Sequence, residues 1–195
     1  MKLNEQVELI NKEMSGSIAI FENEIALFLE TVKGAKLYFE IGCLWGGTTL
    51  LAILLGGVQR VITVDKATGG FWDTGDTRLP GKPVPTLYKV MRNFARFEVA
   101  HKVSLIVGKS DPWPLPFGMI PDVMMIDGDH SYEGCLKDWE NAKKYGGDVV
   151  MIHDYQSGRH PGVQRVVDEH ITPDPEWRKY DQAGTLAVFR RVYEE

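Results

Sequence analysis

An apolar segment near the middle of the chain ends in a cluster of acidic residues and a histidine. Residues 123–126 are apolar throughout, and Asp127, Asp129 and His130 follow within the next four positions. Burial of an unpaired carboxylate is costly, so a cluster at the end of a buried segment needs a partner, a ligand or a metal ion. A histidine with a pKa near 6.5 can also accept a proton at neutral pH. The cluster therefore predicts metal binding or proton transfer.

A glycine turn with a distant carboxylate forms a second candidate site. In YFEIGCLWGGTTL, residues 38–50, Gly42 permits a sharp turn and a close approach by a ligand, and Thr48 or Thr49 can cap the helix that follows. Asp65 ends the next apolar segment. A carboxylate about 20 residues after such a turn is where nucleotide-binding folds hold a ribose diol. We therefore expect a nucleoside at this turn.

The same turn lacks the glycine that a dinucleotide requires. That fingerprint needs a second glycine two positions after Gly42, where the backbone meets a pyrophosphate. This chain has Leu44 there, followed by Trp45. Bulky side chains at these positions disfavour a pyrophosphate but not a nucleoside. A turn that serves only strand–helix packing is the alternative, and Asp65 weighs against it.

The elements that position these residues follow from the hydrophobic pattern. Apolar segments without polar alternation, separated by amphipathic helices, are typical of a parallel sheet covered on both faces. We therefore expect a doubly wound α/β fold, in which ligands bind beyond the carboxyl ends of the strands. The expected strands are residues 37–41, 61–64, 103–107, 122–126, 148–152, 177–180 and 186–190, and the expected helices are residues 4–13, 18–33, 48–55, 87–100, 132–145 and 163–170.

Length and composition restrict the class of protein. The chain has 195 residues, 44% of them hydrophobic, and a net charge of −5, which argues against a dedicated nucleic-acid binder. Cys43 and Cys135 lack the spacing of a disulfide framework, which favours a reducing compartment. The N-terminus has no apolar signal core, and the apolar stretch 50–55 is too short to cross a bilayer. We expect a cytoplasmic protein without nucleic-acid or membrane partners, and a homo-oligomer remains open.

Two segments lie outside the regular alternation. We expect one domain over residues 1–195, with residues 1–35 forming an N-terminal helical segment. Residues 66–86, rich in glycine, proline and aspartate, separate the second strand from its helix. Loops of this length are usually functional or disordered. An active-site cover and a mobile insertion are both open for this loop.

In their order and spacing these motifs resemble a known family. The pattern E-x-G-x-x-x-G-G-[ST], followed by an acidic residue after the second strand, resembles the cofactor site of class I S-adenosylmethionine-dependent methyltransferases. IDGDHSYEG, GGDVVMIHDY and PGVQRVVDE extend the resemblance from about residue 37 to 170. This set is similar to the small-molecule O-methyltransferase branch that includes macrolide-sugar O-methyltransferases. The resemblance implies a Rossmann-like methyltransferase sheet, mostly parallel, with an antiparallel C-terminal strand.

The resemblance also implies a set of cofactor contacts. Glu40 and Gly42 would hold the methionine end of S-adenosylmethionine, Asp65 the ribose hydroxyls, and Ser110 would lie near the adenine. The full set of implied cofactor-binding residues is Glu40, Gly42, Gly46, Thr48, Asp65, Ser110 and Asp127.

A metal site is implied by the same comparison of motifs. In the relatives an acidic residue after the fourth strand and an acidic or amide pair after the fifth hold a divalent cation. Asp127 and Asp154 match two of these positions, and His153 stands where the metal-dependent sugar methyltransferases carry an acid. Hard cations prefer oxygen ligands, whereas imidazole suits manganese, iron or zinc better. Binding of magnesium or manganese by these three residues is therefore weighed against a role in which His153 and Asp154 only hydrogen-bond to neighbouring groups.

His130 is the expected catalytic base. It stands three positions after Asp127, where catechol-type relatives carry a lysine and the macrolide-sugar type a histidine. Methyl transfer to oxygen requires removal of the hydroxyl proton, which a histidine can accept. The alternative is a histidine that caps the helix at 132–145. For His160, in QSGRHPG beside the expected pocket, contact with the substrate is open, but we expect a plain loop role.

We therefore expect methyl transfer from S-adenosylmethionine to a hydroxyl of a small metabolite, either a sugar, a phenol or a natural product, with or without assistance by a divalent metal. Two alternatives stay open. One is a methyltransferase-like domain with other chemistry, as in cephalosporin hydroxylase-like relatives, and the other is a nucleoside-binding protein without catalysis. A nucleic-acid methyltransferase is disfavoured because the chain has no basic tract and no Asn-Pro-Pro-Tyr motif.

Overall fold

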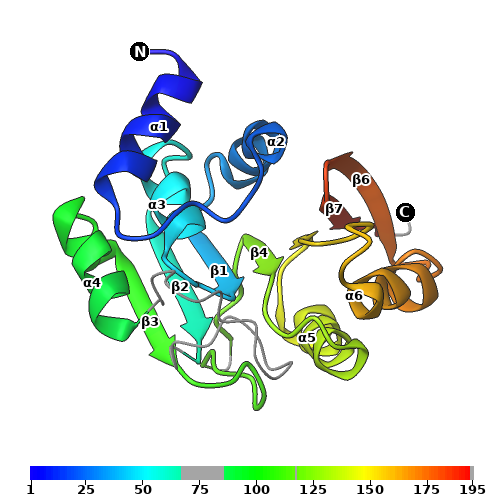
Figure 1. Ribbon diagram of the computed structural model, residues 1–195. Helices are drawn as coiled ribbons and strands as arrows, with labels where there is room; N and C mark the ends of the chain where they lie inside the picture. The colour runs from blue at the N-terminus through cyan, green and yellow to red at the C-terminus, as the bar shows by residue number, and fades with distance from the viewer. Residues whose placement is uncertain (67–85, 117, 194–195) are drawn as a thin grey trace.

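The centre of the molecule is a seven-stranded sheet in a computed structural model that describes residues 1–66, 86–116 and 118–193. The strands follow the order β3-β2-β1-β4-β5-β7-β6 across the sheet (Figure 1). The predicted loop at 66–86 falls almost wholly outside the described residues. The strands are β1 (Leu37–Ile41), β2 (Arg60–Asp65), β3 (Val103–Val107), β4 (Val123–Ile126), β5 (Val149–Ile152), β6 (Trp177–Ala183) and β7 (Leu186–Arg191).

Strand direction agrees with the sequence-based prediction. Each neighbouring pair among β1 to β5 is parallel, and β7 runs antiparallel to β5 and to β6. The predicted Rossmann-like sheet, mostly parallel with an antiparallel C-terminal strand, is confirmed. The reversal of direction places the chain's C-terminal hairpin beside β5.

The central strands are apolar on both faces because helices cover both faces. Successive side chains of a strand point to opposite sides. Tyr38 and Met125 accordingly pack in one hydrophobic cluster, while Phe39 and Met124 pack in the other. All four of these side chains are fully buried. This two-sided burial explains why the strand segments lack polar alternation.

Helices α1 to α4 contribute to the first cluster, and α5 and α6 contribute to the second. Figure 1 shows these two groups on opposite sides of the sheet. No helix in the described ranges combines the length and apolar character needed to cross a membrane. The helices are α1 (Leu3–Glu13), α2 (Glu22–Val32), α3 (Gly47–Leu54), α4 (Leu87–Arg96), α5 (Tyr132–Tyr145) and α6 (Pro161–Val166), the last continued by a π-helical turn over Val167–Ile171.

Three helix boundaries differ from the prediction for local reasons. Helix α2 begins at Glu22 instead of residue 18, because the Glu24 carboxylate accepts the backbone N–H of Phe21 and closes the first turn. Helix α4 ends at Arg96 instead of residue 100, because Glu98 adopts a left-handed φ of 58°. Helix α6 starts at Pro161, a residue suited to the first turn since it lacks an N–H.

Candidate active site

The glycine turn after β1 touches the turn after β4. A Cβ atom placed on Gly42 would lie 2.0 Å from the backbone carbonyl oxygen of Asp127, so only glycine fits at this position. Its φ of 97° also lies in the region that favours glycine. The expected cofactor turn and the acidic cluster are therefore direct neighbours at the carboxyl edge of the sheet.

Asp65 holds the glycine turn in place. One carboxylate oxygen, Oδ2, accepts the backbone N–H groups of Cys43 and Leu44, each at 2.8 Å. Leu44 occupies the position where a dinucleotide site has glycine, yet its φ is 48°, in the left-handed region. The turn thus keeps a glycine-like backbone while the Leu44 side chain packs against the first hydrophobic cluster. Asp65 fixes that conformation from the end of the neighbouring strand.

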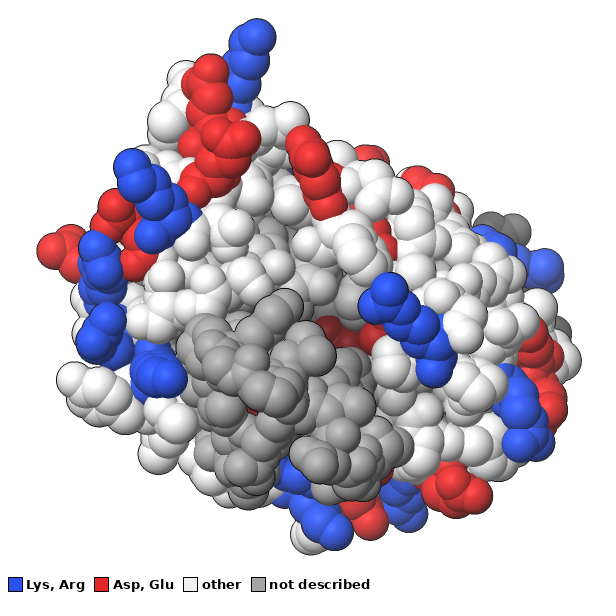
Figure 2. Space-filling view, in the orientation of Figure 1, with Lys and Arg blue, Asp and Glu red and all other residues white. Residues whose placement is uncertain are grey.

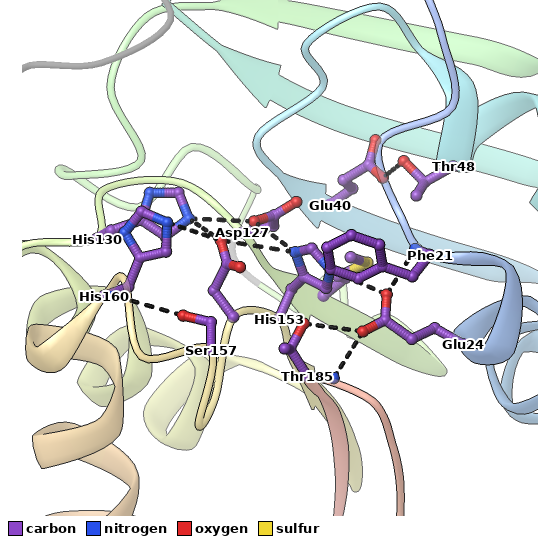
Figure 3. Close-up of polar contacts among 12 residues, drawn as sticks. Phe21, Glu24, Glu40, Thr48, Asp127, His130, His153, Ser157, His160 and Thr185 are labelled. Atoms are coloured by element: carbon purple, nitrogen blue, oxygen red, sulfur yellow. Dashed lines mark hydrogen bonds and ion pairs between the residues drawn. The ribbon is translucent and has the colours of Figure 1, made fainter. Parts of the chain in front are cut away.

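Glu40 lies beneath the turn and does not reach solvent. Each of its two carboxylate oxygens accepts two hydroxyl groups, and Figure 3 shows the bond from Thr48. Burial raises the pKa of Glu40 to about 7, although the surrounding hydroxyls act in the opposite direction. The hydroxyl donors are Tyr38, Thr48, Thr49 and Thr63.

This arrangement corrects one expectation about helix α3. Neither Thr48 nor Thr49 caps the helix, because both hydroxyls donate to Glu40. The residue that precedes the helix is Gly46, with a φ of 80°. A Cβ there would lie 2.5 Å from the ring of Phe94. The threonines instead connect the first turn of α3 to the end of β1.

Two histidines meet Asp127 at the end of β4 (Figure 3). Its Oδ1 atom lies 3.3 Å from Nε2 of His130 and 3.2 Å from Nδ1 of His153. Asp154 completes the group, with its Oδ2 2.9 Å from Nε2 of His130. The structure therefore brings the predicted base and the three predicted metal ligands into one cluster.

His153 and Asp154 face the same cluster although adjacent residues of a strand point to opposite sides. The chain leaves the strand after Ile152, and Asp154 has a left-handed φ of 62°. This turn brings the Asp154 Oδ2 atom to 3.9 Å from Nδ1 of His153. The backbone conformation of one non-glycine residue thus builds the acidic side of the site.

Helix α2 contributes Glu24, which was not predicted from the sequence. Its Oε2 atom lies 3.2 Å from Nε2 of His153, and the residue is fully buried. Oε1 accepts the backbone N–H and the hydroxyl of Thr185 in the turn between β6 and β7. Glu24 therefore joins the N-terminal segment, the end of β5 and the C-terminal hairpin.

Burial and charge compete in setting the pKa values of the cluster. Burial favours neutral His130 and His153, but the neighbouring carboxylates outweigh it and raise their pKa values to about 9 and about 11. Burial would raise the pKa of Asp127, but the two imidazoles outweigh it and lower that pKa strongly. The carboxylates thus favour the protonated forms of both histidines, and the histidines favour the ionised form of Asp127.

No family model and no curated protein matches this chain. Solved structures do match, among them the O-methyltransferase NovP, with a TM-score of 0.70 and 19% identity over 91% of this chain and 84% of that chain. Cofactor-bound Rv0187 from MTB has a TM-score of 0.67 and 16% identity, with coverage of 96% and 88%. The S-adenosylhomocysteine-bound methyltransferase PaMTH1 from Podospora anserina has a TM-score of 0.63 and 12% identity, with coverage of 98% and 88%.

The chain has the methyltransferase fold. Other structures that share this fold carry names that refer to methylation of rRNA and of ribosomal protein L11. The fold alone therefore does not define the methyl acceptor.

The residues at the carboxyl edge of this methyltransferase fold suit a nucleoside cofactor. The turn at Gly42 packs directly on the backbone of Asp127, and Asp65 lies against the same turn, where nucleotide-binding folds hold a nucleoside. Ser110, predicted near the adenine, donates its hydroxyl to Asp138 on α5. Asp138 is buried, its Oδ2 atom has no hydrogen-bond partner among the described residues, and burial raises its pKa to about 6. A buried carboxylate in the middle of an amphipathic helix had given no signal in the sequence.

The predicted metal set fits less well. Asp127, His153 and Asp154 offer ligand atoms within 4.8 Å of one another. However, both ring nitrogens of His153 face carboxylate oxygens, so the ring has no lone pair to offer while it bridges them. Asp127 Oδ1 is likewise shared by two imidazoles. This donor set does not fit magnesium, which prefers oxygen ligands.

His160 belongs to the cluster, contrary to the expected plain loop role. Its Nε2 atom lies 3.4 Å from Oδ2 of Asp154, and its ring centroid lies 4.3 Å from that of His130. Burial lowers the pKa of His160. His130, Asp154 and His160 form a second group whose ligand atoms lie within 4.8 Å of one another. The loop sequence around His160 carried no periodic signal that could have placed it here.

The alternative role of His130 as a helix cap is wrong. Ser131 caps α5, since its hydroxyl oxygen accepts the backbone N–H of Gly134 at 3.1 Å. Asp129 accepts the backbone N–H of Ser131 at 2.9 Å, so it supports the same turn. The side chain of His130 is thereby left for Asp127 and Asp154.

Proposed function

We propose that this chain transfers the methyl group of S-adenosylmethionine to a hydroxyl of a small molecule, such as a sugar, a phenol or a natural product. The observation that carries the proposal is the contact between the glycine turn at Gly42 and the backbone of Asp127. It makes the expected nucleoside site and the histidine–carboxylate cluster neighbours. A methyl donor in the first would lie beside a proton acceptor in the second.

The cofactor, when bound, supplies an electrophilic methyl group on a sulfonium ion. The chain's own residues provide the rest of the chemistry. The turn held by Asp65 binds the nucleoside, and Gly42 lets that turn pack directly against the backbone of Asp127. His130 accepts the proton of the acceptor hydroxyl, and Asp127 and Asp154 stabilise the imidazolium that results. A positive charge bound beside Asp127 would lower the pKa of His130 and increase its neutral fraction.

A small acceptor is favoured over a nucleic acid. The net charge is −5, and Figure 2 shows basic side chains interspersed with acidic ones on the face drawn. Nucleic-acid binding normally depends on a continuous basic surface that contacts phosphates. The similarity of the fold to the O-methyltransferase NovP supports oxygen as the accepting atom.

The proposal is tested in two stages with the full chain. Calorimetry should detect binding of S-adenosylmethionine and S-adenosylhomocysteine, but not of NAD. Mass spectrometry should then detect a methylated product in a panel of sugars and phenols incubated with the protein and S-adenosylmethionine. Binding of NAD without binding of the sulfonium cofactor would refute the proposal. If the protein binds the cofactor and methylates RNA but no small hydroxyl compound, the proposed methyl acceptor would be refuted.

A further inference from the structure

His153 is enclosed by carboxylates in a way that the proposed reaction does not require. Its side chain is 6% exposed, and its two nitrogens lie 3.2 Å from Asp127 Oδ1 and 3.2 Å from Glu24 Oε2. Asp154 lies on the Nδ1 side as well, at 3.9 Å. The partners come from three different elements, α2 and the turns after β4 and β5. Both ring nitrogens of His153 thus face a carboxylate oxygen.

The two contacts determine the charge of the ring. An ionised carboxylate only accepts hydrogen bonds, so each nitrogen that faces one must donate a proton. A neutral imidazole would direct a lone pair at one of the two carboxylates, which would be repulsive in a buried position. The ring therefore carries both protons and a positive charge. The pKa of about 11, which the carboxylates raise against the effect of burial, agrees with this geometry.

Glu24 is built to make that contact. Its backbone lies in the first turn of α2, where the same carboxylate accepts the N–H of Phe21 at 2.7 Å and closes the turn. The other oxygen is fixed by Thr185, at 2.6 Å from the backbone nitrogen and 2.8 Å from the hydroxyl. A fully buried carboxylate with these partners has little freedom to turn away from His153. It therefore fixes both the orientation and the charge of the ring.

We propose that His153 is a built-in cation that takes the place of a magnesium ion beside Asp127, and that Glu24 is the positioning residue that holds it there. This inference rests on the proposed function in one respect: the molecule that binds beside Asp127 is taken to be the small hydroxylated methyl acceptor. Asp127 Oδ1 already receives hydrogen bonds from both His130 and His153. A magnesium ion bound at this oxygen would have to displace these bonds and approach an imidazolium.

The first test measures binding of Mg²⁺ alone to the full chain by titration calorimetry. Wild-type protein should bind Mg²⁺ weakly or not at all. The substitution His153→Asp exchanges the cation for a third carboxylate and should tighten Mg²⁺ binding by roughly tenfold or more, as a change in the sign of a neighbouring charge implies. The matched control His153→Asn removes the cation without adding a carboxylate and should not produce this gain. Wild-type binding as tight as that of His153→Asp would overturn the proposal.

The second test does not depend on the folding of a variant with a new buried acid. Imidazole nitrogen chemical shifts, measured by NMR on the wild-type chain at neutral pH, should identify His153 as doubly protonated. Glu24→Gln should reduce that protonation, while Glu22→Gln, the same change at an exposed position of the same helix turn, should leave it intact. A neutral His153 in the wild type would overturn the proposal. Because neither readout involves methyl transfer, failure here is distinguishable from failure of S-adenosylmethionine binding, which would refute the proposed function instead.

Discussion

Oδ2 of Asp154 lies 2.9 Å from Nε2 of His130, and Asp154 reaches this position with a left-handed φ of 62°. Such a conformation costs a non-glycine residue on the order of 1–3 kcal/mol. The surrounding turn holds it through the bonds from Tyr155 N–H to the Thr185 carbonyl and from Ser157 N–H to the Asp154 carbonyl. The turn after β5 therefore keeps a carboxylate next to the histidine that the proposed reaction uses.

His130→Ala should lower kcat by about 10²–10⁴-fold, the usual loss on removal of a positioned base. Affinity for S-adenosylmethionine should change little, because the glycine turn is held by Asp65 and not by His130. Steady-state rates and calorimetry measure the two quantities separately. His101→Ala, an exposed histidine in the turn before β3, serves as the control and should keep wild-type activity. A variant at position 130 with near wild-type turnover would show that the base lies elsewhere.

The proposed base also predicts an unusual pH dependence. Asp127 and Asp154 raise the pKa of His130 to about 9 against the effect of burial, so the neutral form that accepts a proton becomes populated only as the pH rises towards that value. The kcat/KM of the proposed reaction should therefore increase with pH up to about 9 and then level off. Asp154→Asn removes one of the charges that raise this pKa and should shift the rise to lower pH. A wild-type profile that levels off near the ordinary histidine pKa would contradict the assignment.

Much of the fold could be predicted because the central strands are buried on both faces. An apolar run such as residues 123–126, flanked by helices, is typical of a buried strand. Asp127 and His130 follow its carboxyl end, so they were expected at the edge of the sheet where ligands bind. The positions of Asp65 and Asp154 follow from the same rule, since parallel strands end at one edge.

The site residues that were not predicted from the sequence have a sequence context that suggested ordinary roles. Glu24 is separated from His153 by 129 positions and has the spacing of a helix-capping residue, which it also is. His160 precedes a proline in a polar loop, and its approach to Asp154 depends on the left-handed turn at that residue. Neither contact follows from periodicity, because both depend on how distant elements pack.

Glu40 should make the stability of the ligand-free protein fall as the pH rises. Burial raises its pKa from the ordinary 4.5 to about 7, so the folded state binds its proton more tightly than the unfolded state does. The resulting stabilisation is complete below the unfolded value and is lost as the pH rises through about 7. It amounts to ~3 kcal/mol at most.

Denaturant unfolding at several pH values measures this contribution. As the pH rises from 4.5 through about 7, the free energy of unfolding of the wild type should fall relative to that of Glu40→Gln. Glu22→Gln, at an exposed position of α2, should show no such trend. A wild-type to Glu40→Gln difference that is constant from acid to neutral pH would mean that the four hydroxyl donors keep Glu40 ionised.

Asp65 and Asp122 offer a matched comparison at the two ends of β1. Each uses one carboxylate oxygen to accept two backbone N–H groups at 2.8 Å, Asp65 from the glycine turn and Asp122 from Lys36 and Leu37 at the start of the strand. Asp65→Ala should weaken binding of S-adenosylhomocysteine by about 1–3 kcal/mol, because it removes both a charged hydrogen-bonding group and the bonds that shape the turn. Asp122→Ala should lower the free energy of unfolding to a similar degree and leave cofactor affinity unchanged. Calorimetry and denaturant unfolding on both variants separate the effects, and equal losses of cofactor affinity would show that Asp65 acts only through the stability of the fold.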